Sequence, residues 1–172
     1  MSPTESTVDQ HRAAGPARVR CFVLTVSDTR TPNTDTSGLA IRDLLVAAGH
    51  EVVGQAIVRD EPDQVKATIK EQIADERVQV VITTGGTGIS SRDGTYEAID
   101  KLLEKRMDGF GELFRMLSFQ EIGAAAMMSR ATAGTVQRKA IFVLPGSENA
   151  VRLATSRLII PELSHVLQQL SK

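Results

Sequence analysis

The sequence predicts a three-layer α/β protein, in which a mainly parallel sheet carries helices on both faces. Short runs of apolar and β-branched residues, such as residues 78–84, alternate along the chain with longer patterns that repeat at helical spacing. These runs lack the regular apolar–polar alternation of half-exposed strands, so we expect strands that are buried on both faces. Strands that alternate with helices form right-handed crossovers and hence a parallel sheet.

The first half of the chain contains two strand–helix units. Gly49 stands just beyond a series of periodic apolar residues, which is typical of the end of a helix. Pro62 suits the first turn of a helix, because its missing N–H has no partner there in any case. The expected elements are a strand over 19–26, a helix capped by Thr36 or Ser37, a strand over 51–59 and a helix from Pro62 to about Asp75.

The second half repeats this alternation less regularly. Pro161 interrupts the apolar pattern near the carboxyl end, so we expect it to kink the last helix or divide it into two. The expected elements are a strand over 78–84, a helix capped by Thr95, a helix carrying Phe110 and Phe114, a loop with a short strand in 124–137, a strand over 139–144, and the final helical region.

Length and composition predict one domain. The chain has 172 residues, of which 41% are apolar, and this is enough for one substantial core over residues 19–172. Residues 1–18 contain almost no apolar side chains to offset the entropy of ordering, so we expect a disordered tail.

Charge and residue usage exclude several functions. The net charge is −1 with scattered Lys and Arg, which argues against nucleic-acid binding. No apolar run is long enough for a membrane span and no signal sequence is apparent, so a cytoplasmic location is expected. Cys21 lies in an apolar run and is expected to be a buried thiol. His11, His50 and His165 are isolated and lack metal-ligand spacing.

The most informative segment is glycine-rich and follows the strand over 78–84. It reads Thr83-Thr84-Gly85-Gly86-Thr87-Gly88 and continues to Arg92-Asp93. Glycines allow backbone N–H groups to approach a ligand, so the segment is either a phosphate cradle or an ordinary tight turn. It is not a P-loop, because no Lys follows the last glycine. It is not a dinucleotide fingerprint, because Ser91 replaces the third glycine.

Four loops should meet at the carboxyl ends of the strands, where ligands bind in open α/β sheets. They begin at Ser27-Asp28, Asp60-Glu61, Thr83 and Pro145. Asp60 and a second carboxylate, Asp93, would repel a bound phosphate unless a divalent cation lay between them, and Mg²⁺ binds one or two carboxylates together with phosphate oxygens. Arg92 either offsets phosphoryl charge or forms an ordinary pair at a helix start.

The chain resembles the MoaB/MogA family of molybdenum cofactor biosynthesis proteins, and it is more similar to the MoaB branch. The resemblance extends from about Val19 to the carboxyl terminus. The segments that carry it are Thr83 to Gly88 with Arg92-Asp93, Gly109-Phe110-Gly111-Glu112, Phe114 to Phe119, Ser129-Arg130 and Leu144-Pro145-Gly146-Ser147.

This resemblance implies a molybdopterin-binding, MogA-like fold and a reaction. In that reaction the terminal phosphate of molybdopterin attacks the α-phosphate of Mg-ATP, which gives adenylyl-molybdopterin and pyrophosphate. By motif, Asp60 and Asp93 correspond to catalytic carboxylates and to candidate Mg²⁺ ligands. The implied substrate-binding residues are Thr84, Gly85, Gly86, Thr87, Gly88, Arg92, Ser129, Pro145, Gly146 and Ser147.

The resemblance also implies a homo-oligomer, either a trimer or a hexamer, with the helix of Phe110 and Phe114 as a candidate contact. Two positions depart from the MogA pattern: Glu148 follows the Pro-Gly-Ser turn, and Gly94 follows Asp93. An acidic side chain that pointed into a phosphate pocket would oppose binding. The alternative to an enzyme is therefore a non-catalytic molybdopterin-binding or scaffold protein of the same pathway.

Overall fold

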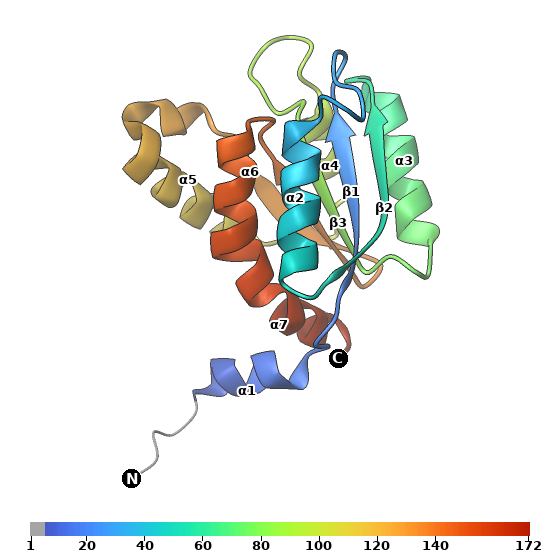
Figure 1. Cartoon of the computed structure of the whole chain (residues 1–172), viewed down its shortest axis with the longest axis vertical. Coiled ribbons are helices and arrows are strands. Elements are labelled where there is room, and N and C mark those ends of the chain that lie inside the picture. Colours follow the sequence, from blue (N-terminus) through green and yellow to red (C-terminus); the bar gives the residue numbers. More distant parts are fainter. Residues whose placement is uncertain (1–5) are drawn as a thin grey trace.

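The computed structural model describes residues 6–172 and has the expected alternation of strands and helices (Figure 1). In chain order the elements are α1 (Thr7–Ala14), β1 (Arg20–Val26), α2 (Thr36–Ala47), β2 (Glu51–Val58), α3 (Pro62–Ala74), β3 (Val80–Thr84), α4 (Thr95–Asp100), β4 (Lys105–Arg106), α5 (Asp108–Ile122), the 3₁₀-helix η1 (Gly123–Met128), β5 (Thr132–Val136), β6 (Lys139–Leu144), α6 (Glu148–Ala154), the π-helix η2 (Thr155–Ile159) and α7 (Ile160–Leu170).

The strands form one mixed sheet in the order β2-β1-β3-β6-β5-β4. The four strands β2, β1, β3 and β6 are parallel, whereas β5 and β4 pair antiparallel at one edge. The short β5–β6 connection accounts for the change of direction. Gln137 and Arg138 have φ angles of 46° and 65°, the left-handed conformation that suits a two-residue hairpin turn. The predicted mainly parallel sheet is confirmed.

Helices cover both faces of the sheet, and successive residues of the central strands point to opposite cores. Val23 of β1 and Ile82 of β3 pack with α2, α5, α6 and α7 in one cluster. Leu24 of β1 and Val81 of β3 pack with α3 and α4 in the other. This two-sided burial explains why the strands read as continuous apolar runs. The expected three-layer architecture is confirmed.

The amino-terminal segment differs from the disordered tail expected over residues 1–18. Residues 1–5 lie outside the described part of the chain, but Thr7–Ala14 forms α1, which lies against α7 (Figure 1). Ser6 caps the helix, and the Arg12 guanidinium pairs with Glu162 of α7. The Ser164 hydroxyl donates to the carbonyl of Pro16 over 2.8 Å. Polar contacts to a distant helix therefore order a segment that is poor in apolar residues.

Other differences are local. Asp35 caps α2, because its carboxylate accepts the N–H of Gly38 over 2.9 Å; neither Thr36 nor Ser37 is the cap. Thr95 is the first residue of α4 and makes no cap, and Gly94 occupies the cap position. The region over 124–137 contains most of η1 and the whole of β5, which is more regular than the expected loop with a short strand.

The carboxyl-terminal helical region stays helical from Glu148 to Leu170, but it changes to π-helical geometry in η2 just before Pro161. Pro161 is the second residue of α7. A proline cannot donate an N–H to the preceding turn, and a π-turn is one way to accommodate the lost hydrogen bond. Cys21 is buried as expected, and burial raises the pKa of its thiol to about 12.

Candidate functional site

The loops that follow β1, β2, β3 and β6 meet at one end of the sheet, as expected. The N–H of Ser27 donates to the carbonyl of Val58 over 2.8 Å, which joins the ends of β1 and β2. The N–H of Gly85 donates to Leu144 O over 3.1 Å, which joins the ends of β3 and β6. The hydroxyl of Thr84 donates to Pro145 O over 2.9 Å. Parallel register thus places four chemically distinct loops side by side.

The glycine-rich segment requires glycine for steric reasons. Gly85 has φ +96°, and a Cβ there would lie 2.1 Å from the carbonyl oxygen of Val26. Gly86 has φ +67°, and a Cβ there would lie 2.3 Å from the hydroxyl of Thr95. Within residues 6–172, the N–H groups from Gly86 to Ile89 have no acceptor in the chain. A run of unpaired donors at a strand end favours an anion cradle over an ordinary turn.

Asp93 lies at the carboxyl-terminal end of this loop and forms hydrogen bonds with its backbone. Its Oδ2 accepts the N–H of Ser90 over 3.0 Å, and its own N–H donates to Ser90 O over 3.1 Å. A Cβ on Gly88 would lie 2.5 Å from Asp93 Oδ2. The carboxylate therefore lies directly against the glycine backbone, which keeps it close to any anion that the loop binds.

Asp60 is half-buried and occupies the loop after β2. The hydroxyl of Thr95 donates to Asp60 Oδ1 over 3.0 Å, and the N–H of Asp60 donates to Asp28 Oδ1 over 3.3 Å. Burial raises the pKa of the Asp60 carboxyl, and the negative charges of Asp93 and Asp28 act in the same direction, while the Thr95 hydrogen bond opposes them. The carboxylates of Asp93 and Asp28 are thus near enough to repel that of Asp60.

The negative charge around Asp60 favours a bound cation. The side chains of the described residues alone are too few to complete the coordination of a metal ion. Among the described residues, no group of three or more His, Cys, Asp or Glu side chains is placed to hold a metal ion. Mg²⁺ usually binds one or two carboxylates and completes its octahedron with water and phosphate oxygens. The pair of Asp60 and Asp93 fits that pattern if phosphate supplies the remaining ligands.

Arg92 points to carboxylates and does not pair with its neighbour Asp93. Its Nη2 lies 3.2 Å from Asp28 Oδ2 and 3.8 Å from Glu61 Oε1, and its side chain is 70% exposed. The predicted alternatives were a phosphoryl-binding group and a helix-start pair with Asp93. The contacts differ from that pair, because Arg92 joins the loops after β1, β2 and β3 on the solvent side; a phosphoryl-binding role stays a prediction.

The Pro145-Gly146-Ser147 turn is held by its own backbone. Pro145 O accepts from Thr84, and Gly146 O accepts the Ser37 hydroxyl over 2.8 Å. Ser147 caps α6, since its Oγ accepts the N–H of Ala150 over 3.2 Å. Glu148, the acid that would oppose phosphate binding if it pointed inward, pairs instead with Arg152 along α6 at 2.8 Å.

Arg130 is a structural residue of this site that sequence reasoning missed. Its Nε donates to Thr87 O over 2.9 Å and its Nη2 donates to Gly88 O over 2.7 Å. The same guanidinium pairs with Glu97 and lies over the ring of Tyr96, 4.8 Å from the centroid. The one available signal was the Ser129-Arg130 pair in the family motif. Ser129 itself donates its N–H to Ala126 O and precedes this clamp in the chain.

Comparisons with known proteins identify relatives of this chain. A family model described as "Probable molybdopterin binding domain" matches residues 22–165. The "Molybdenum cofactor biosynthesis protein B" of Halalkalibacterium halodurans is 52% identical over 167 residues, which are 96% of this chain and 98% of that protein. A crystal structure of a molybdenum cofactor biosynthesis protein B superposes with a TM-score of 0.89 at 50% identity, over 91% of this chain and 98% of that chain. The tungsten cofactor synthesizing protein MoaB from Pyrococcus furiosus has a TM-score of 0.81 at 38% identity, over 91% and 99% of the two chains.

Proposed function

Because the chain belongs to the MoaB/MogA family of molybdopterin-binding proteins, we propose that it acts in molybdenum cofactor biosynthesis as a molybdopterin adenylyltransferase. The observation that carries this proposal is that Asp60 lies beside Gly86, and Asp93 beside Gly88, in a glycine loop with unpaired N–H donors. Such a site suits the transfer of a phosphorus group between two anionic partners, since it supplies both donors for phosphate oxygens and carboxylates for a cation.

In the proposed reaction a terminal phosphate oxygen of molybdopterin attacks the α-phosphorus of ATP. A new P–O–P bond forms, the bond between the α- and β-phosphates breaks, and pyrophosphate leaves with the electron pair. The attacking group is already an anion, so the chain need not supply a strong base. Its task is to position the two phosphates and to stabilise the charge that develops between them.

Different residues of the chain would bind the phosphates and the cation. The N–H groups from Gly86 to Ile89 bind phosphate oxygens, and Arg130 fixes their direction by holding the carbonyls of Thr87 and Gly88. Asp60 and Asp93 would hold Mg²⁺, whose charge offsets that of the triphosphate when it is bound.

The test is a transfer assay with purified protein, molybdopterin, ATP and Mg²⁺. Formation of pyrophosphate and adenylyl-molybdopterin in equal amounts supports the proposal. Binding of molybdopterin without either product would overturn the transferase and leave a binding protein of the same pathway. Omission of Mg²⁺ and addition of a chelator are the matched controls, and both should stop product formation.

The second candidate is a non-catalytic molybdopterin-binding or scaffold protein. The observation that favours it is the pairing of Arg92 with Asp28 and Glu61, because a neutralised arginine contributes little to phosphoryl charge. The transferase remains the stronger proposal, since Arg130 and the loop N–H groups do not depend on Arg92.

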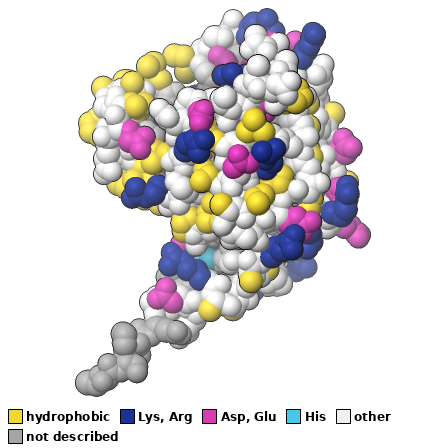
Figure 2. Space-filling model, in the orientation of Figure 1, with side chains coloured by type: hydrophobic (Ala, Val, Ile, Leu, Met, Phe, Trp, Pro, Cys, Tyr) yellow, Lys and Arg dark blue, Asp and Glu magenta, His cyan; other side chains and the backbone are white. Residues whose placement is uncertain are grey.

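We also propose that the chain acts as a homo-oligomer, a trimer or a hexamer, in the cytoplasm. The expected contact was the helix of Phe110 and Phe114, which is α5. Phe114 is buried in the chain's own core and Phe110 packs on Phe142, so a contact through α5 would use its other side chains. Figure 2 shows a hydrophobic patch over the projecting region of α5 and η1. The exposed apolar side chains of these two helices are Leu113, Met116, Phe119, Ile122, Met127 and Met128. A patch of this kind suits a subunit contact.

A variant that adds charge to this patch tests the assembly. Phe119 is 62% exposed, so Phe119→Glu should lower the molar mass measured by light scattering without unfolding the chain. Val46→Glu, a change at an exposed residue of α2, is the control and should leave the mass unchanged.

None of the helices within residues 6–172 is long and apolar enough to cross a membrane.

A further inference from the structure

Ser37, in the first turn of α2, contacts the turn that follows β6. Its side chain is only 5% exposed, and its hydroxyl donates to Gly146 O over 2.8 Å. The helices α2 and α6 pack in the same hydrophobic cluster on one face of the sheet (Figure 1). The hydrogen bond therefore joins the start of α2 to the turn that leads into α6. A buried side chain thus fixes the direction of one carbonyl in this turn.

The start of α2 is itself held by a buried carboxylate. Asp35 accepts the hydroxyl of Thr25 over 2.6 Å and the N–H of Gly38 over 2.9 Å. Because Thr25 belongs to β1, these bonds tie the helix to the sheet. A Cβ on Gly38 would lie 2.2 Å from Asp35 Oδ2, so the helix start is closely packed on this carboxylate. A buried polar network with its bonds made is rigid. Ser37 therefore presents its hydroxyl at a fixed place.

Hydroxyl groups bind both carbonyls of the turn, and this sets the direction of its N–H groups. Thr84 donates to Pro145 O over 2.9 Å, as Ser37 does to Gly146 O. All peptide bonds of the described residues are trans. In a trans peptide the carbonyl and the N–H that follows it point in opposite directions. The N–H of Gly146 therefore points away from Thr84, and the N–H of Ser147 points away from Ser37.

These two N–H groups are available to a ligand. Within residues 6–172, neither Gly146 N–H nor Ser147 N–H has an acceptor in the chain, and both residues are exposed. The turn also lies against the glycine loop, because a Cβ on Gly146 would be 3.3 Å from Gly85 Cα. The two donors thus adjoin the unpaired N–H groups from Gly86 to Ile89. Backbone N–H groups that converge in this way suit the oxygens of an anion.

We propose that Ser37 is a positioning residue for substrate: its hydroxyl holds the Gly146 carbonyl so that the Ser147 N–H is directed at a substrate phosphate. This inference rests on the proposed function, in which this turn binds one of two phosphate-bearing substrates. Ser37 acts through the turn, since its hydroxyl is already donated to Gly146 O. Without that hydroxyl the carbonyl would turn to water. Rotation of the peptide unit would then point an oxygen, in place of an N–H, at the phosphate.

The experiment compares two serines that make the same kind of hydrogen bond. Ser164 is half-buried and donates to the carbonyl of Pro16, also over 2.8 Å, so Ser164→Ala is the matched control. Both Ser37→Ala and Ser164→Ala should melt a few °C below wild type. We expect only Ser37→Ala to raise the Kd for molybdopterin or for Mg-ATP, about tenfold in titration calorimetry. The substrate whose Kd rises is the one that the turn binds.

A second variant keeps the hydroxyl. Ser37→Thr should restore the affected Kd to within about threefold of wild type. Unchanged Kd values for both substrates in Ser37→Ala would overturn the proposal. An equal rise in Ser164→Ala, or no recovery in Ser37→Thr, would also overturn it, because the hydroxyl of Ser37 would then have no specific effect. Binding that is sensitive to Ser37→Ala in a protein that forms no pyrophosphate would support the proposal and remove the transferase alone.

Discussion

The hydroxyl of Thr95 donates a hydrogen bond to Oδ1 of Asp60 across 3.0 Å, and this contact joins the first residue of α4 to the loop after β2. Thr95 is fully buried, and its Oγ1 also limits the space beside Gly86. One side chain thus orients the carboxylate and forces the neighbouring loop residue to be glycine. The contact explains how two loops that are far apart in the sequence form one site.

Asp60→Asn should raise stability at neutral pH while it removes activity. The pKa of the Asp60 carboxyl is raised mainly by burial, with Asp93 and Asp28 adding to the effect. A raised folded-state pKa means that the ionised carboxylate opposes folding above that pKa, and that this cost is absent below the unfolded value of about 3.9. Asparagine keeps the oxygen that Thr95 binds and has no charge. We expect a melting temperature about 2 °C higher at pH 7.

The pH dependence makes this prediction specific. The difference between Asp60→Asn and wild type should disappear as the pH falls below about 4, where both side chains are neutral. Asp63→Asn, which changes a fully exposed carboxylate in the first turn of α3, should give no stabilisation. A lower melting temperature for Asp60→Asn at pH 7 would mean that the ionised carboxylate stabilises the free protein.

Thr95→Val removes the hydrogen bond that lowers the pKa of Asp60. It should therefore raise this pKa further and move the acid limb of the pH–rate profile to higher pH.

Asp93→Asn should reduce turnover by roughly 10²–10³-fold, the usual cost of removing one group that stabilises transition-state charge. Molybdopterin affinity should stay within about threefold of wild type, since the unpaired N–H groups of the loop remain. The amide oxygen of the new asparagine can still accept the N–H of Ser90, so the loop should keep its shape. Initial rates at several concentrations of both substrates separate kcat from KM. Unchanged turnover would remove Asp93 from the mechanism.

The sequence predicted those parts of the molecule that depend on local patterns. The strand ends at Thr84 and Leu144 follow from apolar runs that stop at glycine or proline, and a parallel sheet must bring such ends together. Asp60 and Asp93 were accessible in the same way, because each stands in a loop at the end of a strand. Gly85 indicated a backbone conformation that favours glycine. The sequence did not show that the carbonyl oxygen of Val26 leaves no space for a Cβ there.

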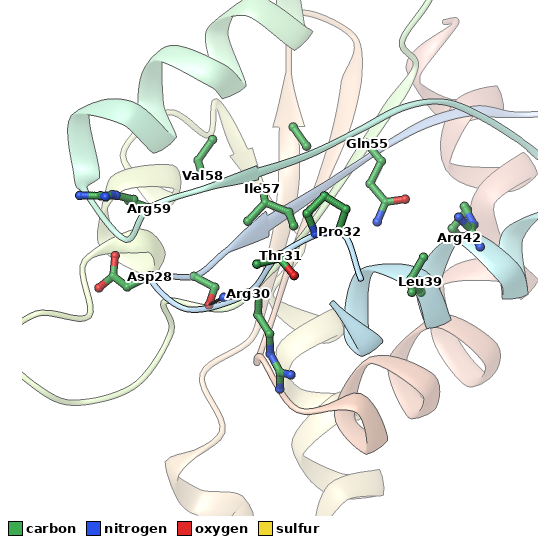
Figure 3. A pocket seen from close by; sticks show the side chains of 12 residues that line it. Asp28, Arg30, Thr31, Pro32, Leu39, Arg42, Gln55, Ile57, Val58 and Arg59 are labelled. Carbon is green, nitrogen blue, oxygen red and sulfur yellow. Dashed lines mark hydrogen bonds between the residues drawn. The ribbon is translucent and has the colours of Figure 1, made fainter. Parts of the chain in front are cut away.

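What remained hidden depends on partners remote in the sequence. Arg130 contacts Thr87 and Gly88, which lie 43 and 42 residues earlier, and the Ser129-Arg130 pair in the family motif does not indicate these contacts. A pocket beside the site is lined by residues of the loop after β1, of α2 and of the end of β2 (Figure 3). Because these are three separate segments, its wall residues do not form a motif. Helix α1 was missed for the same reason: its stabilising partner Glu162 is 150 residues from Arg12.

Arg130→Met should loosen the glycine loop. The change removes the donors to the carbonyls of Thr87 and Gly88 and leaves Glu97 without its partner. Loss of a charged hydrogen-bond donor to such groups costs about 1–3 kcal/mol, which corresponds to a fall of a few °C in melting temperature. The KM for molybdopterin should rise more than kcat falls.

Hydrogen exchange locates the effect of this change. The amides of Ser90, Asp93 and Thr95, which are hydrogen-bonded within the loop or to it, should exchange faster in Arg130→Met than in wild type. Arg130→Lys should not restore them, because lysine lacks the fork that binds two carbonyls at once. Arg157→Met, at an exposed arginine of η2, serves as the control and should leave loop exchange unchanged. Equal exchange in all four proteins would show that the loop holds its conformation without the clamp.

Gly15→Ala should detach α1 from the body of the protein. Gly15 has a φ of −81°, so an alanine is not strained by its backbone, but its Cβ would lie 2.0 Å from the carbonyl oxygen of Ser164. Backbone atoms on α7 cannot move aside as a flexible side chain would, so α1 must shift. Overpacking of this kind costs about 1–3 kcal/mol. Gly109→Ala is the matched control, since no atom lies within 4 Å of the added Cβ there.

Limited proteolysis and thermal melting measure the outcome. Gly15→Ala should be cut near α1 much faster than wild type and should melt a few °C lower, whereas Gly109→Ala should resemble wild type or melt slightly higher, as expected for glycine replaced by alanine in a helix. Deletion of residues 1–18 should reproduce the lower melting temperature with the sheet still folded, because the contacts of α1 are with α7 and none of its described side chains reaches the strand ends. Proteolysis of Gly15→Ala at the wild-type rate would mean that α1 is not docked on α7 in solution.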